Sequence, residues 1–266
     1  MQIIACLKQV PDTAEVKIDQ KTNTLIREGV PSIINPFDLN AVEEGLLLRE
    51  RFGGTLTVIS MGPPQVETAL RDVLSLGADR AVLLCDRAFA GADTLATSYT
   101  LAAGIKKIGS FDLILCGKQA IDGDTAQVGP EIAEWLDIPH LAYVRSIDEV
   151  LSVGPTKTRI TVSRSMEGGY ERVSASLPAL LTVVREINEP RLPSYRASLQ
   201  AKIKEIALWG ASDLSTEPER IGITGSPTRV SRVFVPEYER QGQFFAGSPE
   251  DQAKALVASL RSAGLA

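Results

Sequence analysis

The chain has 266 residues, of which 44% are hydrophobic and 23% charged, and its formal net charge is −5 at pH 7. This composition predicts a globular protein with a sizeable core, built as one large domain or as one domain with appendages. The negative charge argues against a nucleic-acid surface, which needs a basic patch or stripe.

Continuous apolar runs in the first half predict parallel strands that are buried on both faces. These runs cover residues 3–7, 55–61, 80–85 and 111–116. Helical periodicity lies between them, and strand–helix alternation of this kind predicts a doubly wound, mostly parallel α/β sheet. The segment 8–32 interrupts the alternation, and its turn residues predict a small hairpin or an ordered loop.

Four helices are expected between these strands, and local signals mark their ends. The expected boundary residues are, in chain order, Asn35 as a cap with Pro36 after it, Gly77, Asp93 and Gly109. The fourth helix runs from Val128 to Trp135, and Pro130 either kinks it or starts its regular part.

After Pro139 the pattern changes to alternating segments. Residues 156–163 and 171–177 flank a glycine pair and predict an antiparallel hairpin, and residues 179–184 predict one more buried strand. Residues 188–236 are interrupted by prolines, and a structureless loop of that length is unusual in a compact domain, so we interpret them as an arm that wraps a partner. The expected division is an α/β domain at 1–187 and an arm with a final helix at 188–266.

Side chains suited to catalysis are scarce. His140 starts an apolar strand, and we interpret it as a strand-edge residue, with a general base as the alternative. Neither a nucleophile motif nor a metal-ligand spacing occurs, so we expect no catalytic and no metal-binding residues. Any redox chemistry must therefore come from a cofactor.

Cellular context follows from the cysteines and from the apolar runs. Cys6, Cys85 and Cys116 have no CxxC spacing, and we interpret them as buried or partly buried free thiols in a reducing compartment. The first apolar run is too short for a signal-peptide core, and no run reaches the roughly 18 residues of a membrane span. We expect a soluble, cytoplasmic protein without a membrane span.

Ligands of doubly wound sheets bind beyond the carboxyl ends of the strands, where the strand order reverses. Four segments are expected there: 6–8, 35–38, 61–64 and 117–128. The last of them, GKQAIDGDTAQV, follows a strand and opens a helix, so its glycines and free N–H groups favour a phosphate. Asp122 and Asp124 oppose a phosphate and could instead face ribose or water or cap the helix. From the residues alone, a nucleotide site and a plain strand-to-helix loop both stay open.

The same segments resemble the beta subunits of electron-transfer flavoproteins over most of the chain. The shared motifs are CLKQVPDTAEVKID, INPFDLNAVEE, MGPP, SLGADRAVLL, LCGKQAIDGDTAQVGPEIAEWL and NEPR. The resemblance implies a flavodoxin-like, adenine-nucleotide-binding fold, an FAD-containing alpha subunit as partner, and either AMP or a second FAD in the beta subunit. The cofactor contacts that it implies are Cys6, Asn35, Pro36, Phe37, Asp38, Met61, Gly62, Gly117, Lys118, Gln119, Ala120, Ile121, Asp122, Gly123, Asp124, Thr125, Ala126, Gln127 and Val128.

A further stretch, DRAFAGADTLATS, resembles the electron-bifurcating branch of this family. It implies that Asp93, Thr94 and Thr97 lie near the second flavin, although Asp93 alone could simply cap its helix. Members of this branch are similar to enzymes that oxidise NADH and send one electron to ferredoxin or flavodoxin. The other electron passes through the alpha FAD to an acyl-CoA or other flavin dehydrogenase. The hairpin at 167–171 departs from this pattern and looks like the simple, non-bifurcating branch, in which a glutamate often stands at the position of Ser165.

In the simple branch, the loop after NEPR docks the dehydrogenase through an apolar anchor. Here that loop offers Leu192 and Tyr195, and an ordinary contact to the alpha subunit is the alternative for Tyr195. Three hypotheses result: a beta subunit with FAD in bifurcation, a beta subunit with structural AMP in simple electron relay, and a stand-alone adenine-nucleotide-binding regulatory protein. The arm argues against the third, because a solitary module would not need it.

Overall fold

The computed structural model describes residues 1–12, 18–19, 24–25, 31–153, 157–231 and 242–265. The chain divides into two compact units, Met1–Ser231 and Arg232–Ala266. No helix within the described ranges is both long and apolar enough to cross a membrane.

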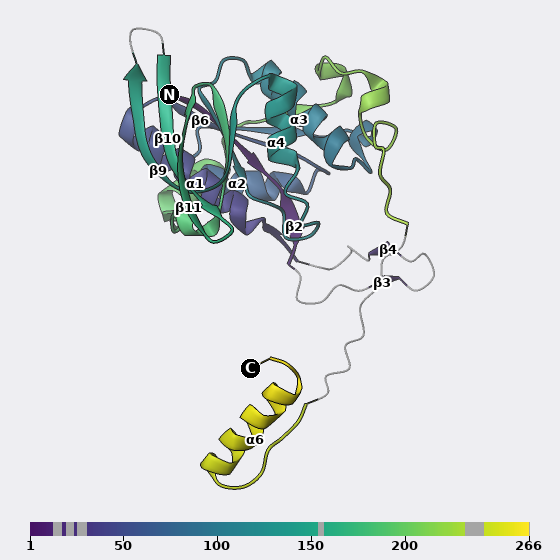
Figure 1. The fold of residues 1–266 in the computed structure, drawn as a ribbon. Coiled ribbons are helices and arrows are strands. Elements are labelled where there is room, and N and C mark those ends of the chain that lie inside the picture. Colours follow the sequence, from purple (N-terminus) through teal and green to yellow (C-terminus); the bar gives the residue numbers. More distant parts are fainter. Residues whose placement is uncertain (13–17, 20–23, 26–30, 154–156, 232–241, 266) are drawn as a thin grey trace. The chain divides into compact units, whose positions relative to one another are not determined.

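A nine-stranded sheet forms the centre of the first unit, counted over its described residues (Figure 1). The strand order is β11-β10-β9-β12-β8-β1-β6-β7-β13. The strands are β1 (Gln2–Leu7), β6 (Thr55–Met61), β7 (Arg80–Leu84), β8 (Leu113–Gly117), β9 (His140–Val153), β10 (Lys157–Met166), β11 (Gly169–Ser176), β12 (Ala179–Val183) and β13 (Ile206–Trp209). All neighbours from β9 to β13 pair in parallel, whereas β10 pairs antiparallel with both β9 and β11. The expected doubly wound sheet with an added hairpin is confirmed.

Helices cover both faces of this sheet. They are α1 (Pro36–Phe52), α2 (Val66–Leu76), α3 (Thr94–Ile108), α4 (Val128–Leu136) and α5 (Tyr195–Ala201). Apolar residues of α1 and α2 share one core cluster with Ile3, Ala5 and Leu7 of β1, and those of α3 and α4 share the other with Ile4 and Cys6. Because strand side chains alternate between faces, a strand covered on both sides must be apolar at nearly every position. This explains the continuous runs in the sequence.

The strand order reverses beside β1. The chain passes from β1 to β6 and β7 on one side and then crosses over to β8 on the other side. The carboxyl ends of β1 and β8, at Leu7 and Gly117, therefore border the crevice that this topology creates.

The helix boundaries follow the local signals with one difference. Gly77 ends α2 with a positive φ of 126°, and the Asp93 side chain accepts the N–H of Ala96 at the start of α3. Pro130 is the third residue of α4, where its missing N–H costs no intrahelical bond. Asn35 precedes α1 as expected, but its side chain makes no capping hydrogen bond. The prediction that Asn35 caps this helix is wrong for the side chain, which binds elsewhere.

Two strands were not expected at their observed extent. β9 is 14 residues long, and β13 lies within the segment interpreted as an arm. β13 has four residues and pairs with β7 through Ile206 opposite Ala81, so residues up to Ser231 belong to the first unit. A four-residue edge strand with an exposed Leu208 carries too little periodicity to be seen in the sequence.

Two short strand pairs lie in the segment 8–32. β2 (Gln9–Pro11) pairs antiparallel with β5 (Ser32–Ile34), and β3 (Ile18–Asp19) with β4 (Thr24–Leu25). The hairpin or loop expected over this segment otherwise lies outside the described residues. In the second unit, α6 (Pro249–Ser262) begins at the cap Ser248, as the expected final helix, and has no buried residue.

Candidate functional site

A buried carboxylate joins the two strand ends at the reversal. Asp38, in the first turn of α1, accepts the N–H of Lys8 at 2.8 Å and the N–H of Gly117 at 3.1 Å. Burial raises the pKa of Asp38 to about 7, although these hydrogen bonds, one from Asn35 and the charge of Lys8 oppose the rise. Asp38 therefore joins the backbone at the ends of β1 and β8. A ligand in the crevice would approach the backbone at these same two positions, Lys8 and Gly117.

The Asn35 side chain fixes the loop that follows β8. Its Nδ2 donates to the carbonyl oxygen of Gln119 at 2.8 Å, and its Oδ1 accepts the N–H of Ile121 at 3.2 Å. One amide thus satisfies a donor and an acceptor of the loop backbone, which explains why it is not free to cap α1. The contact spans more than 80 residues of sequence and ties the segment 35–38 to the segment 117–128.

The loop itself remains accessible. Residues Asp122 to Thr125 and Gln127 are exposed, and Asp124 and Ala126 adopt positive φ values of 57° and 55°. Left-handed backbone at two non-glycine residues in one loop is uncommon and often accompanies function. The structure therefore keeps the loop open at the crevice and does not pack it beneath other elements.

An ion pair accounts for one of the carboxylates that oppose a phosphate. Lys8 Nζ lies 2.6 Å and 2.7 Å from the two oxygens of Asp122. The Asp124 carboxylate accepts a hydrogen bond from the Gln119 side chain. The charge of Asp122 is thus compensated at the mouth of the site, and its repulsion of an anion is reduced.

Two further segments border the crevice, and we call them, together with the loop 117–128, the rim of the site. They are the end of β6 and the start of α3. Gly62 follows β6, and its N–H donates to Leu84 of the next strand. Thr94, the first residue of α3, donates from Oγ1 to the Gln127 side chain at 3.0 Å. The structure thereby brings the start of α3 to the loop 117–128.

Asp93 has partners of its own. Its carboxylate accepts the N–H of Ala96 at 3.1 Å, and the N–H and hydroxyl of Thr228 at 3.0 Å and 2.8 Å. Burial opposes ionisation, but these hydrogen bonds and one from Ser226 outweigh it and lower the pKa of Asp93. Asp93 is therefore a helix cap and also the anchor of residues 226–228, and Thr97 lies one turn further along α3.

The thiols of Cys6 and Cys116 lie next to each other on β1 and β8. The register pairs Ala5 with Leu115, and both cysteines are buried in the same core cluster. A hydrogen bond with Cys6, followed by burial, raises the pKa of the Cys116 thiol. Both cysteines are thus buried core residues with free thiols, and their backbone borders the site.

Sequence reasoning missed an aromatic residue at this edge of the sheet. Tyr143 in β9 has a positive φ of 60°, and its N–H donates to Thr182 Oγ1 at 3.2 Å. Lys118 Nζ lies 5.1 Å from the centre of its ring. Local periodicity gives no sign of this bend, because it arises where the register between β9 and β12 shifts.

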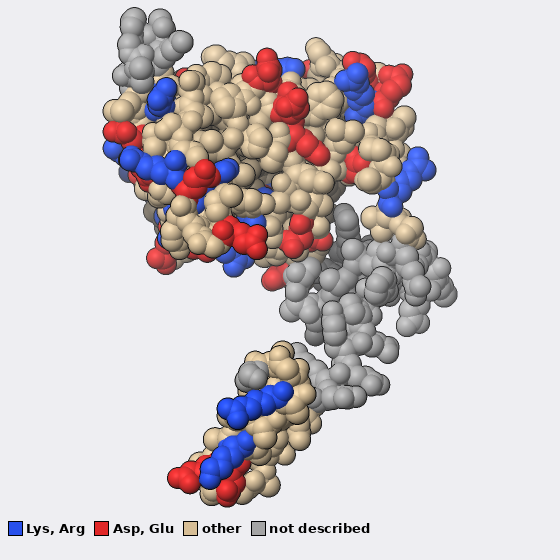
Figure 2. Space-filling model, in the orientation of Figure 1, with Lys and Arg blue, Asp and Glu red and all other residues tan. Residues whose placement is uncertain are grey.

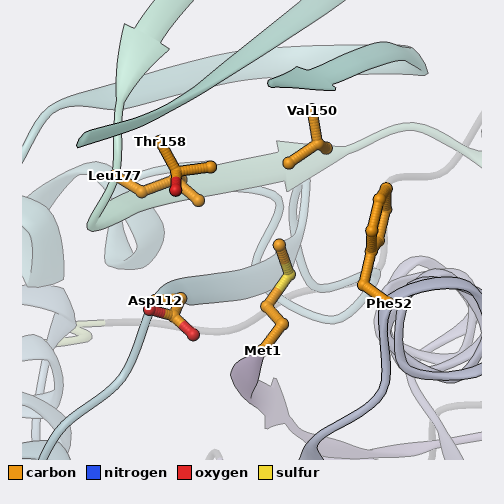
Figure 3. A pocket seen from close by; sticks show the side chains of 6 residues that line it. All are labelled: Met1, Phe52, Asp112, Val150, Thr158 and Leu177. Atoms are coloured by element: carbon orange, nitrogen blue, oxygen red, sulfur yellow. The ribbon is translucent and has the colours of Figure 1, made fainter. Parts of the chain in front are cut away.

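His140 and a hollow beside Asp112 lie at the amino ends of the strands, away from this crevice. His140 pairs with Leu180 at the amino end of β12, on the opposite edge of the sheet. A hollow of about 280 Å³ opens at that same edge, lined by Met1, Phe52, Asp112, Val150, Thr158 and Leu177 (Figure 3). Its one carboxylate, Asp112, already accepts the N–H of Gln2 at 2.7 Å. We find no cluster of three metal-ligating side chains among the described residues.

The surface charge is mixed on the face shown in Figure 2. Basic and acidic side chains alternate over the described residues of the first unit, and no continuous basic stripe crosses this face. The two predicted docking residues stand out differently, because Leu192 and Tyr195 are 90% and 82% exposed.

Comparisons with known proteins agree with the geometry. The electron transfer flavoprotein domain matches residues 22–214. A protein of Thermoanaerobacterium thermosaccharolyticum named electron transfer flavoprotein subunit beta is 50% identical over 98% of both chains. The caffeyl-CoA reductase-Etf complex subunit CarD of Acetobacterium woodii is 49% identical over 98% of both chains, and protein FixA of Bradyrhizobium diazoefficiens is 47% identical over 97% of this chain and 90% of its own. The chain therefore belongs to the electron transfer flavoprotein family and is one of its beta subunits.

Proposed function

We propose that this chain binds FAD at the carboxyl ends of β1 and β8 and takes part in electron bifurcation together with an FAD-containing alpha subunit. The observation that carries the proposal is the loop 117–128, which Asn35 and Asp38 fix at the strand reversal and which stays exposed. An adenine nucleotide is the ligand that this family and this topology both favour at such a crevice.

The residues present fit such a group. Lys118 supplies positive charge beside the loop, Lys8 offsets the charge of Asp122 there, and α4 presents the free N–H groups of its first turn. When bound, the flavin would supply the one-electron and two-electron chemistry that no side chain here can provide. The chain's own task is to hold the nucleotide, orient it and keep the loop geometry fixed.

The extent of the rim favours FAD over AMP. Thr94 of α3 contacts Gln127 of the loop, so the site is bounded both by the start of α3 and by the loop. AMP in a simple electron relay is the second candidate, and one observation favours it. The Asp93 carboxylate is already occupied by Ala96 and Thr228, as expected for a residue that only caps its helix.

Three partners follow from the proposal. No residue of α6 is buried, and Leu256 and Val257 on this helix and Phe244 before it are exposed. We therefore assign α6 to the alpha subunit as part of the arm. Leu192 and Tyr195 are assigned to a flavin dehydrogenase, in keeping with the relative named as part of a caffeyl-CoA reductase complex. NADH is the proposed electron donor and ferredoxin or flavodoxin the low-potential acceptor, in the cytoplasm.

Cofactor extraction from the co-expressed heterodimer tests the proposal directly. Two FAD per heterodimer are expected. One FAD with one AMP would favour the simple relay instead, and a stable monomer that binds ATP alone would contradict both readings. The Asn35→Ala variant removes both hydrogen bonds to the loop and should lower occupancy of the beta site while the alpha FAD is kept. The matched control is Asn188→Ala. Its amide also joins two segments of the chain, but it donates to Asn40 and Glu44 of α1 instead of to the loop.

A further inference from the structure

The proposed docking surface extends beyond the two residues seen in the sequence. Leu199 and Ile203 are also exposed, at 47% and 87%, and with Leu192 and Tyr195 they cover α5 and its two flanks. The exposed Arg196 lies among them. We call residues 192–203 the docking segment.

The docking segment cannot hold its shape by itself. α5 has seven residues, which is below the length at which a helix is stable alone. Within α5, Ala201 is the one buried residue, and the Ser194 hydroxyl caps the first turn by accepting the N–H of Ala197 at 3.1 Å. Contacts at the two ends of the segment must therefore supply its order.

The front end is held by Arg191. Its Nε and Nη2 bind the Glu43 carboxylate at 2.9–3.0 Å, and Nη2 also binds Glu50 at 3.2 Å. The Glu43 side chain is only 5% exposed, so this ion pair is largely shielded from water. Hydrogen bonds with Glu50 and Glu43 raise the pKa of Arg191 further, and the bond with Arg191 lowers the pKa of Glu50.

A neighbouring amide reinforces this end. Asn188 donates to the carbonyl oxygen of Asn40 at 3.1 Å and to Glu44 at 3.0 Å, and Asn40 donates back to the Asn188 backbone at 2.9 Å. The three carboxylates, of Glu43, Glu44 and Glu50, and Asn40 all belong to α1. The sequence 188–191 is thus bound to a single helix by a fully paired polar cluster.

The rear end is held by Arg71 of α2. Its Nη1 donates to the carbonyl oxygens of Ala201, Lys202 and Lys204 at 3.0, 3.1 and 3.3 Å. These are orphan carbonyl groups at and after the end of α5, where a cation is favoured. Glu67 orients the guanidinium from one turn earlier in α2 at 2.6 Å, and Lys204 Nζ binds the Ala78 carbonyl oxygen at 2.8 Å.

We propose that Arg191 and Arg71 are positioning residues that hold the docking segment in a preformed arrangement for a flavin dehydrogenase. This inference rests on the docking role proposed above and adds the device that orders the surface. A segment ordered in advance loses less conformational freedom on binding, and the gain appears in the affinity for the partner and not in the electron-transfer step. α1, which begins at the cofactor site, and α2 thus also carry the partner surface.

The test uses the alpha–beta heterodimer and a purified acyl-CoA dehydrogenase that accepts its electrons. The variants are Arg191→Met and Arg71→Met, with Arg164→Met as the matched control. Arg164 also forms an ion pair, with Glu171 at 2.6 Å, but it lies on the hairpin. Since Arg191→Met leaves Glu43 buried and unpaired, the double variant Glu43→Gln/Arg191→Met keeps the test valid if the single variant folds poorly.

Three readouts separate positioning from a loss of fold. Amide hydrogen exchange of residues 192–203 should accelerate by about tenfold or more in both variants, because local opening becomes easier. The KM for the dehydrogenase should rise about fivefold to tenfold with kcat within about twofold, as expected for lost preorganisation. Flavin content should not change, and the control should change none of the three readouts. Arg191→Lys keeps the positive charge but loses the planar guanidinium with its several N–H donors, so its KM should lie between those of the wild type and Arg191→Met.

Unchanged exchange in 192–203 would overturn the inference, as would faster exchange with an unchanged KM. The variant Tyr195→Ala tells the two proposals apart. If Tyr195→Ala raises the KM and the arginine variants do not, docking stands and positioning is wrong. If Tyr195→Ala leaves the KM unchanged, the docking role itself is wrong and positioning for it fails too, whatever the exchange rates show.

Discussion

The Asp38 carboxylate lies directly against Gly117 at the end of β8 and accepts its N–H at 3.1 Å. A Cβ at Gly117 would come within 2.7 Å of the Phe37 backbone and closer still to the Asp38 oxygen. The loop 117–128 can therefore begin at this place only if residue 117 has no side chain. This close contact fixes the position of the loop relative to the start of α1.

The first prediction concerns this contact. Gly117→Ala should force α1 and the loop apart and lower nucleotide occupancy of the beta site by about tenfold or more, since buried overpacking typically costs about 1–3 kcal/mol. Nucleotide released from the purified heterodimer measures the effect. Gly169→Ala is the control, because no atom lies within 4 Å of the added Cβ and the residue lies on the hairpin, outside the predicted contacts. Equal occupancy in Gly117→Ala and the wild type would mean that the loop does not form the site.

The second prediction concerns the pH dependence of stability. Asp38 has a pKa of about 7 in the folded protein against 3.8 as its ordinary value, so between these values the folded state binds more protons than the unfolded state. Protonated Asp38 therefore contributes fully to the free energy of unfolding below about pH 4. This contribution is lost as the pH rises towards 7, and the free energy of unfolding falls by up to about 1.4 kcal/mol per pH unit. Asp38→Asn should remove this slope.

Urea unfolding at several pH values between 4 and 8 measures the slope for both proteins. Asp38→Asn should also lower the free energy of unfolding by about 1–3 kcal/mol, because an amide cannot accept both the Lys8 and the Gly117 N–H. Asp72→Asn serves as the control, because burial also raises the pKa of Asp72 but that carboxyl is less buried and lies on α2. Parallel pH profiles for the wild type and Asp38→Asn would show that Asp38 ionises normally.

The third prediction separates the two roles at the start of α3. Thr94→Val removes the hydrogen bond to Gln127 and should lower flavin occupancy of the beta site while the alpha flavin is kept. Asp93→Ala, alone or with Thr94→Val, should lower occupancy as well. It should also cost about 1 kcal/mol of stability, because it deletes a helix cap and the anchor of Thr228. Thr228→Val is the control that loosens the same anchor without touching the rim, and a loss of flavin in it equal to that in Thr94→Val would argue against a flavin contact at Thr94.

The fourth prediction concerns the ion pair at the mouth of the site. Lys8→Met leaves the Asp122 carboxylate uncompensated beside the loop and should weaken nucleotide binding by about tenfold or less, since the pair is partly exposed. The double variant Lys8→Met/Asp122→Asn should recover most of the loss. Titration of AMP or FAD into the heterodimer without its beta-site nucleotide measures the affinities of the wild type, Lys8→Met, Asp122→Asn and the double variant, which together form a double-mutant cycle. Additive losses would show that Lys8 does not act through Asp122.

Much of the site could be predicted from the sequence because its segments follow strand ends. The apolar runs at 3–7 and 111–116 and the loop after the second run predict both strands and the crevice beyond them. What could not be predicted is which side chains meet there. The role of Asn35 illustrates this: the sequence predicts a helix cap from the Asn-Pro pair, whereas the side chain binds backbone at Gln119 and Ile121.

The sequence by itself determined the parallel sheet, the positions of the helices α1 to α4 and the loop that borders the crevice, because apolar periodicity and cap residues act over a few neighbouring positions. Only the tertiary structure decided that β13 extends the sheet, that Asp38 is buried between two strand ends, and that Arg191 binds Glu43 across 148 positions of sequence. These outcomes depend on strand order and on the packing of α1. A local sequence pattern does not predict which distant side chain will pair with a buried charge or a free carbonyl group.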